Sequence, residues 1–254
     1  MKQFLLPRWY AGQARISISG EDYRYLARVL RLKSGASLSA VDAHGARYIM
    51  KLAAFSRSAC EAEISPVAAA PKEAVSASGS PALTLLQCLP KGRKIDLIIR
   101  QATEAGVSRI VLLESERSVA REQEDAGRMR RLEKIAREAL QQSGSPRLPS
   151  IEAPRPLASL RDAAGEWGTA LFFHEERLSG GTLHELLAGP MERISILIGP
   201  EGGLSSSEVD LLAGAGFHSV FLGGTVLRVE TAAIYAIAAV QTILQERDAW
   251  KAAH

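Results

Sequence analysis

The chain of 254 residues has little cysteine and no recognisable metal-binding motif. Its two cysteines, Cys60 and Cys88, form no spaced pair, which excludes a disulfide-rich scaffold and a cysteine-ligated metal site. The five histidines show no His-Glu-x-x-His spacing, so we expect no metal. No apolar run is long enough to span a membrane, and the N-terminus has no apolar segment of signal-peptide length. We therefore expect a cytoplasmic protein without membrane contact.

Three glycine motifs of common enzyme classes are also absent. No glycine loop carries the Lys-Ser/Thr pair of a P-loop, and no Gly-x-Gly-x-x-Gly is followed by an acidic ribose ligand. A Gly-x-Ser-x-Gly nucleophile turn is missing as well. These absences argue against nucleotide-phosphate chemistry and against a serine hydrolase.

Charge is unevenly distributed along the chain. Residues 1–65 carry ten Lys and Arg against five Asp and Glu, whereas the whole chain has a net charge of only +3. A basic segment on a near-neutral body is typical of a module that binds a polyanion, although a solvated basic face fits equally well.

The first 65 residues show the period-two alternation of half-buried strands, at 15–18, 37–41, 48–52 and 60–64. One helix is expected at 21–32, with Leu26, Val29 and Leu30 as its apolar stripe. Arg24, Arg28 and Arg31 recur on another face at spacings that could follow a phosphate backbone. A solvated helix face is the other interpretation of these three arginines.

Residues 66–81 are rich in Pro, Ala, Ser and Gly, which is typical of a linker. We accordingly predict a β-rich domain at 1–68, a linker at 69–81 and a second domain at 82–254. In the second domain short apolar strands (82–89, 109–113, 169–173, 194–198, 219–222) alternate with helical patterns (95–105, 127–142, 182–187, 206–215, 229–245). This alternation predicts an α/β fold with a mostly parallel sheet covered on both faces.

Two glycine turns would lie at the carboxyl ends of neighbouring strands of this sheet, where ligands bind in such folds. They are Gly199–Gly203 and Gly223–Thr225. Glu201 within the first turn would repel phosphate, so a neutral or cationic ligand is favoured. Arg228 precedes an apolar helix at a position that the helix dipole disfavours, which makes it a candidate functional residue. Pairing of Arg228 with Glu230 or Glu201 is the alternative.

These residues resemble the signature of the RsmE-type ribosomal RNA methyltransferases, a family of the SPOUT class. The resemblance is carried by Ile198-Gly199-Pro200-Glu201-Gly202-Gly203 and by Leu227-Arg228-Val229-Glu230-Thr231. Upstream blocks match too, namely Ala102-Thr103-Glu104, Ser115-Glu116-Arg117-Ser118 and Arg28-Val29-Leu30-Arg31.

The resemblance implies a trefoil-knotted α/β methyltransferase domain that binds S-adenosylmethionine, an N-terminal PUA-like β-barrel for RNA, and a homodimer. It implies methylation of N3 of a uridine in 16S rRNA of the small ribosomal subunit. The cofactor-binding residues that it implies are Phe173, His174, Ile198, Gly199, Pro200, Glu201, Gly202, Leu222, Gly223, Val226, Leu227, Arg228 and Thr231. Arg24, Arg28 and Arg31 would contact RNA.

For the reaction we expect Arg228 to stabilise negative charge that develops on a uridine carbonyl oxygen. Glu201 would orient the cofactor or accept the N3 proton, and we favour orientation. The chain departs from the family pattern at Gln101, Ser145, Gly224 and Thr225, which weakens the expectation for RNA contacts. Methylation of another RNA, such as transfer RNA, and a non-catalytic RNA-binding scaffold are the competing hypotheses.

Overall fold

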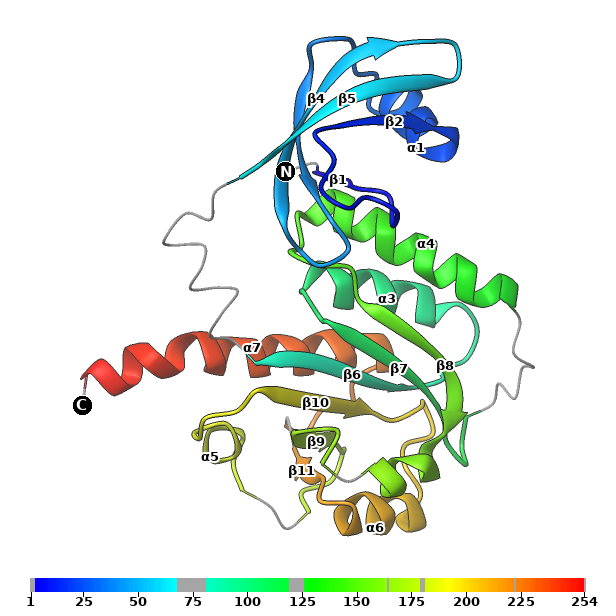
Figure 1. Ribbon diagram of the computed structural model, residues 1–254. Coiled ribbons are helices and arrows are strands. Elements are labelled where there is room, and N and C mark those ends of the chain that lie inside the picture. Colours follow the sequence, from blue (N-terminus) through cyan, green and yellow to red (C-terminus); the bar gives the residue numbers. More distant parts are fainter. Residues whose placement is uncertain are drawn as a thin grey trace. The chain divides into compact units, whose positions relative to one another are not determined.

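The computed structural model describes residues 3–67, 81–118, 126–163, 165–178, 181–221 and 223–253 (Figure 1). The chain forms two compact units. The first contains residues 1–75 together with 140–148, and the second contains residues 76–139 and 149–254.

The first unit is built on a five-stranded sheet with the order β1-β3-β4-β5-β2. Its strands are β1 (Gln3–Leu5), β2 (Arg15–Ser19), β3 (Ser37–Val41), β4 (Arg47–Phe55) and β5 (Ala59–Pro66). The alternation places Ile16 and Ile18 of β2 in a core with Phe4 and Met50. β1 and β2 are the two edges of the sheet, so this PUA-like unit is a half-barrel. β1 was not predicted, because three residues are too few to show a period.

The predicted helix at 21–32 is shorter than expected and changes its winding. α1 (Gly20–Arg24) passes into a π-helix, η1 (Tyr25–Val29), in which the amide of Leu30 donates to the carbonyl of Tyr25. A π-turn is wider than an α-turn, so the three-to-four-residue spacing no longer defines one face. The prediction for Val29 is wrong, because this residue is 66% exposed, whereas Leu26 is buried.

Arg31 lies beyond the helix, in the left-handed region with φ +52°. Arg24, Arg28 and Arg31 are all exposed, but they do not form the predicted stripe along one α-helix. The sequence period could not show this, because it assumes regular α-helical winding throughout.

The second unit contains a parallel six-stranded sheet with the order β11-β9-β10-β6-β7-β8. Its strands are β6 (Ala82–Cys88), β7 (Arg109–Glu114), β8 (Ser150–Pro156), β9 (Thr169–Phe173), β10 (Arg193–Ile198) and β11 (His218–Val220). The five predicted strands are confirmed. β8 was missed, because its sequence SIEAPRP holds two prolines and one large apolar residue, a composition that only an edge strand tolerates.

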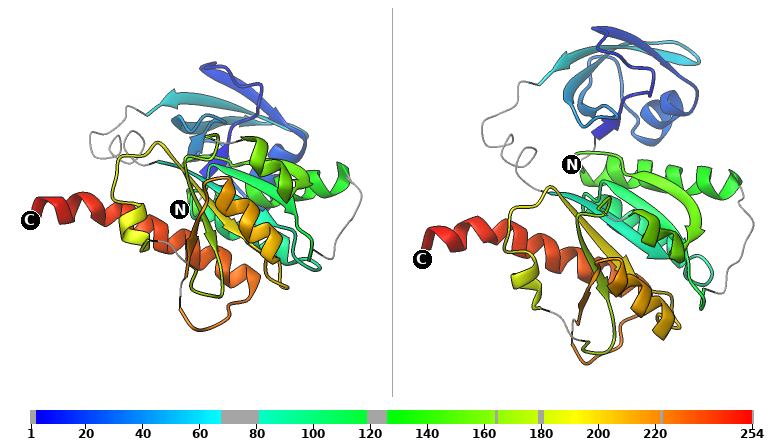
Figure 2. Two further views of the ribbon diagram at one scale, coloured as in Figure 1. Left: turned by 90° about the horizontal axis from the view of Figure 1, so that it is seen from below. Right: turned by 60° about the horizontal axis from the view of Figure 1, so that its bottom comes forward.

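Helices lie on both faces of this sheet, as the strand–helix alternation predicts (Figures 1 and 2). They are α3 (Lys94–Glu104), α4 (Ala126–Ser143), the 3-10 helix η2 (Leu157–Ala163), α5 (Leu183–Leu186), α6 (Ser206–Gly214) and α7 (Val229–Ala253). Leu86, Val111, Phe172 and Leu197 from four strands form one core with Leu212 of α6 and Leu160 of η2. α3 packs against α7, and the Gln241 side-chain amide of α7 donates to the carbonyl of Ala105 at 2.5 Å.

Both ends of α6 are capped by local sequence features. The Ser205 hydroxyl accepts a hydrogen bond from the amide of Glu208, whose carboxylate accepts one from the amide of Ser205. These two bonds form a capping box at the start of α6. Gly216 follows the end of α6 with φ +83°, as a C-terminal glycine should. None of the helices in the described ranges is both long and apolar enough to cross a membrane.

Candidate functional site

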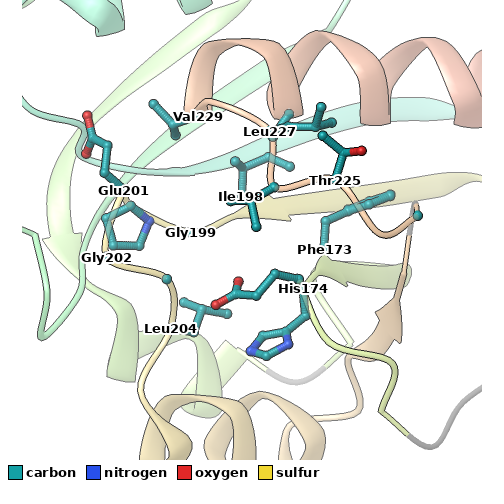
Figure 3. Close-up of a pocket in the computed structure, with 16 residues that line it drawn as sticks. Phe173, His174, Ile198, Gly199, Glu201, Gly202, Leu204, Thr225, Leu227 and Val229 are labelled. Atoms are coloured by element: carbon teal, nitrogen blue, oxygen red, sulfur yellow. The ribbon is translucent and has the colours of Figure 1, made fainter.

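A cavity of about 230 Å³ opens at the carboxyl ends of β9 and β10, where the two glycine turns meet (Figure 3). The loop after β10 forms one wall, and the segment that leads into α7 forms the opposite wall. Ten of the predicted cofactor residues line this cavity. They are Phe173, His174, Ile198, Gly199, Pro200, Glu201, Gly202, Gly223, Val226 and Leu227.

Three predicted cofactor residues do not lie in this wall. Arg228 and Thr231 are exposed and lie outside the lining, while Leu222 falls outside the described residues. Gly203 and Thr225, which belong to the two predicted glycine turns, also line the cavity. Four lining residues were not predicted, namely Glu175, Leu204, Val229 and Ala232. The signal for two of them was present, since Val229 and Ala232 are three residues apart on one face of α7.

Glycine is needed in the first turn for two separate reasons. Gly203 adopts φ +70°, and a Cβ placed there would lie 2.8 Å from Oε1 of Glu175. A Cβ at Gly202 would lie 3.3 Å from the Cβ of Arg117. The amide of Gly203 donates to the carbonyl of Pro200 at 2.9 Å, which closes the turn. The bare backbone of the turn therefore forms the cavity wall.

Glu201 binds the loop that precedes α3. Its carboxylate accepts hydrogen bonds from the amide of Lys91 at 3.0 and 3.2 Å and from Nζ of Lys94 at 2.7 Å. Figure 3 shows the carboxylate turned away from the middle of the cavity. The side chain of Glu201 is 22% exposed and that of Lys94 is 37% exposed. Glu201 thus connects the glycine turn after β10 to the segment that follows β6.

These bonds keep Glu201 ionised. Partial burial raises its pKa, but the hydrogen bonds from Lys94 and from the amides of Glu201 and Lys91 outweigh burial, so the pKa lies below the usual 4.5. Because the folded-state pKa is lowered, the resulting stabilisation is present above pH 4.5 and is lost as the pH falls through the lowered value. A carboxylate of this kind is a weak proton acceptor near neutral pH.

Glu201→Gln should therefore leave the acidic limb of the kcat–pH profile in place. It should raise the Kd for S-adenosylmethionine about fivefold, because a partly exposed ion pair contributes about 1 kcal/mol. The measurements are a pH–rate profile between pH 5 and 9 and calorimetric titration of the cofactor. Loss of the acidic limb would instead identify Glu201 as the proton acceptor.

The loop after β7 also makes hydrogen bonds to the glycine turn after β10 and to α6. Nη1 of Arg117 donates to the carbonyl of Gly202 at 2.8 Å. The amide of Glu116 donates to Oε1 of Glu208 at 2.8 Å, and the Ser207 hydroxyl donates to the Glu116 carboxylate at 2.9 Å. The pKa of Glu116 is lowered by hydrogen bonds from Ser205 and Ser207. The strand-end loops after β6, β7 and β10 are therefore joined by side-chain hydrogen bonds.

Arg228 is the last residue before α7, and its carbonyl accepts a hydrogen bond from the amide of Ala232 at 2.8 Å. No carboxylate in the described part of the chain pairs with its guanidinium, so the alternative pairing with Glu201 or Glu230 is wrong. Its neighbours Leu227 and Val229 both line the cavity. The charge of Arg228 is thus available at the edge of the cavity.

The composition of the wall limits the ligand. None of the lining residues is Lys or Arg, and Glu175 brings a carboxylate, whereas that of Glu201 is paired with Lys94. Phe173, Ile198 and Leu227 give an apolar surface beside the backbone of the glycine turns. This wall suits S-adenosylmethionine, which has a sulfonium cation and an uncharged adenine, and it is unsuited to phosphates. Among the described residues, no three His, Cys, Asp or Glu side chains gather as metal ligands.

Two of the departures from the family pattern occupy structural positions. Ser145 is buried in the first unit, and its carbonyl accepts a hydrogen bond from the Gln3 side chain at 2.8 Å. Gln101 is half-buried in α3. Of the other two, Thr225 lines the cavity and Gly224 is exposed.

Sequence profiles of two families match the two parts of the chain. A profile described as an RNA methyltransferase domain matches residues 78–241. A second, described as an RNA methyltransferase PUA domain, matches residues 18–65.

Curated proteins and solved structures match as well. The ribosomal RNA small subunit methyltransferase E of Mycobacterium bovis is 32% identical over 66% of this chain and 66% of its own length. The protein of that name from Synechocystis is 28% identical over 92% of this chain and 75% of its own. The crystal structure of the Neisseria gonorrhoeae protein of that name, bound to S-adenosyl methionine, superposes with a TM-score of 0.83. It is 28% identical and covers 96% of this chain and 98% of its own.

Proposed function

The chain belongs to the RsmE-type family of ribosomal RNA methyltransferases, with a PUA unit and a SPOUT methyltransferase unit, and we propose from this premise that it methylates 16S rRNA. The methyl donor is S-adenosylmethionine and the acceptor is N3 of a uridine in the small ribosomal subunit. The observation that carries the proposal is the cavity wall, in which two glycine turns and apolar side chains meet without any lysine or arginine.

The bound cofactor would supply an electrophilic methyl group on a positively charged sulfur. The backbone of Gly199, Gly202 and Gly223 and the side chains of Phe173 and Leu227 would hold it, because they form the wall. Glu201 would act through its bonds to Lys91 and Lys94, which fix the turn against the neighbouring loop. Holding both reactants in one orientation supplies a large part of the rate in such a transfer.

Arg228 is the catalytic residue in this proposal. The N3 position of uridine carries a proton, and its loss leaves negative charge on the adjacent carbonyl oxygens. A guanidinium at the cavity edge, unpaired with any described carboxylate, is suited to stabilise that charge. Water or a group of the bound RNA would then take the N3 proton, since the lowered pKa of Glu201 makes that carboxylate a weak acceptor.

Three further properties belong to the proposal. Arg24, Arg28 and Arg31 contact RNA, which their exposure on the PUA unit supports. Two copies associate as a homodimer, which is supported by the exposed side chains of Leu97 on α3 and Tyr235 on α7. The enzyme works in the cytoplasm, where its rRNA substrate is found.

Radiolabelled methyl transfer to purified RNAs tests this function. We expect incorporation into unmethylated 16S rRNA or small subunits and none into transfer RNA, with 3-methyluridine as the labelled nucleoside. Incorporation into transfer RNA alone would favour the other substrate class. Absence of cofactor binding at millimolar S-adenosylmethionine would favour the non-catalytic scaffold.

A further inference from the structure

A basic turn lies directly against the cofactor loop. The sequence Lys91-Gly92-Arg93-Lys94 follows β6 and leads into α3. Its position is fixed relative to the cavity, because the carboxylate of Glu201 accepts hydrogen bonds from both ends of the turn. Arg117 contacts the same cofactor loop, since its guanidinium donates to the carbonyl of Gly202. We name Lys91, Arg93, Lys94 and Arg117 the basic rim.

The charge of the basic rim is only partly neutralised. Lys94 pairs with Glu201, and Glu116 beside Arg117 is engaged by the Ser207 hydroxyl. No carboxylate in the described ranges pairs with Lys91 or Arg93, and both residues are exposed. Counting Glu116, Glu201 and the cavity-lining Glu175 against the four cations leaves one net positive charge around the cavity.

Two of these cations occupy positions that local helix energetics disfavours. Arg93 is the N-cap residue of α3 and makes no side-chain capping bond, and Lys94 is the first helical residue. The N-terminus of a helix carries partial positive charge, so cations cost a few tenths of a kcal/mol there. Ser, Thr, Asp or Asn would be the favoured cap. The ion pair with Glu201 offsets this cost at Lys94. Arg93 has no carboxylate partner in the described ranges, so a ligand explains its charge better than stability does.

We propose that the basic rim binds the phosphates on either side of the target nucleotide and so places its base at the cavity. This inference rests on the proposed function and adds a second RNA contact region, on the catalytic unit itself. Two of its cations, Lys94 and Arg117, donate hydrogen bonds to Glu201 and Gly202, which also line the cavity, and the backbone amide of Lys91 donates to Glu201. A phosphate bound at the basic rim would therefore hold the nucleotide in a fixed position relative to the methyl donor, because both the rim and the cavity include the glycine turn after β10.

Charge reversal at Lys91 or Arg93 tests the inference, with Arg193→Glu as the matched control. Arg193 is exposed at the amino end of β10, the strand whose carboxyl end carries the cofactor turn. Arg93→Glu puts a carboxylate at the N-cap of α3, where the helix dipole favours it, so folding should not suffer. Arg28→Glu on the PUA unit provides a comparison for the other RNA region.

The readout is binding of a 16S rRNA transcript at several KCl concentrations, with calorimetric S-adenosylmethionine titration of each variant. Lys91→Glu and Arg93→Glu should each weaken RNA binding about tenfold and reduce the slope of log Kd against log salt by about 0.7. Cofactor affinity should not change in Arg93→Glu, because the side chain of Arg93 makes no capping bond and does not line the cavity. Arg193→Glu should bind RNA like the wild type.

Two outcomes would contradict the proposal that the basic rim binds RNA phosphates. Wild-type RNA affinity and salt dependence in both rim variants would show that the rim does not contact RNA. A loss of cofactor affinity with unchanged RNA binding would show that these cations serve the carboxylate of the cofactor. Failure of the proposed function is separate, because it would appear as a wild-type protein that methylates no 16S rRNA.

Discussion

Arg228→Ala should lower kcat for methyl transfer at least about a hundredfold, the loss typical for removal of one preorganised group that stabilises transition-state charge. The Kd for S-adenosylmethionine should stay within about twofold, because Arg228 does not line the cavity and holds no ion pair with a described carboxylate. Single-turnover kinetics with 16S rRNA and calorimetric cofactor titration measure the two quantities separately.

Arg228→Lys is the control for this prediction. It keeps the charge but loses the planar pair of donors, so it should recover only part of the activity. A near-normal kcat in Arg228→Ala would remove Arg228 from the mechanism. A parallel loss of cofactor affinity would assign it to cofactor binding instead.

Gly203→Ala should raise the Kd for S-adenosylmethionine at least about tenfold. An L-residue at φ +70° costs about 1–2 kcal/mol, and the new Cβ would lie 2.8 Å from the carboxylate of Glu175. The Glu175 side chain can move, but it lines the cavity, so relief of the contact changes the wall. Calorimetry measures the affinity, and thermal unfolding shows how much of the strain appears as lost stability.

Gly216→Ala separates conformational cost from cavity shape. Gly216 has φ +83°, and a Cβ at this position would have no other atom within 4 Å. It lies at the end of α6, away from the cavity wall. Gly216→Ala should therefore lose stability as Gly203→Ala does, while binding S-adenosylmethionine with wild-type affinity. Equal loss of affinity in both variants would show that destabilisation alone explains the effect at Gly203.

The sequence predicted those parts of the fold that depend on the periodicity of apolar residues. The apolar strands β6, β7, β9 and β10 were found because burial on both faces removes the polar positions. β8 was not found, since an edge strand with two prolines lacks that pattern. The π-turn of η1 was not found either, because a change of helical winding leaves no trace in a pattern of hydrophobic residues.

In the candidate site too, local features were predicted and contacts between distant segments were not. Residues within the two glycine turns were predicted because the turns themselves are visible in the sequence. The partners of Glu201 were missed, because Lys91 and Lys94 lie more than a hundred positions away from it along the chain. Glu175 was also missed, although it directly follows the predicted residues Phe173 and His174. The trefoil knot stays a prediction from the family resemblance, because strand order does not by itself say whether a loop is threaded.

The central claim is that this chain methylates N3 of a uridine in 16S rRNA. Mass mapping of the modified nucleosides of 16S rRNA, from a strain lacking the gene and from the same strain complemented with it, tests that claim most directly. We predict one 3-methyluridine that disappears in the deletion strain, returns with the wild-type gene and does not return with Arg228→Ala. An unchanged set of 16S rRNA modifications in the deletion strain would contradict it.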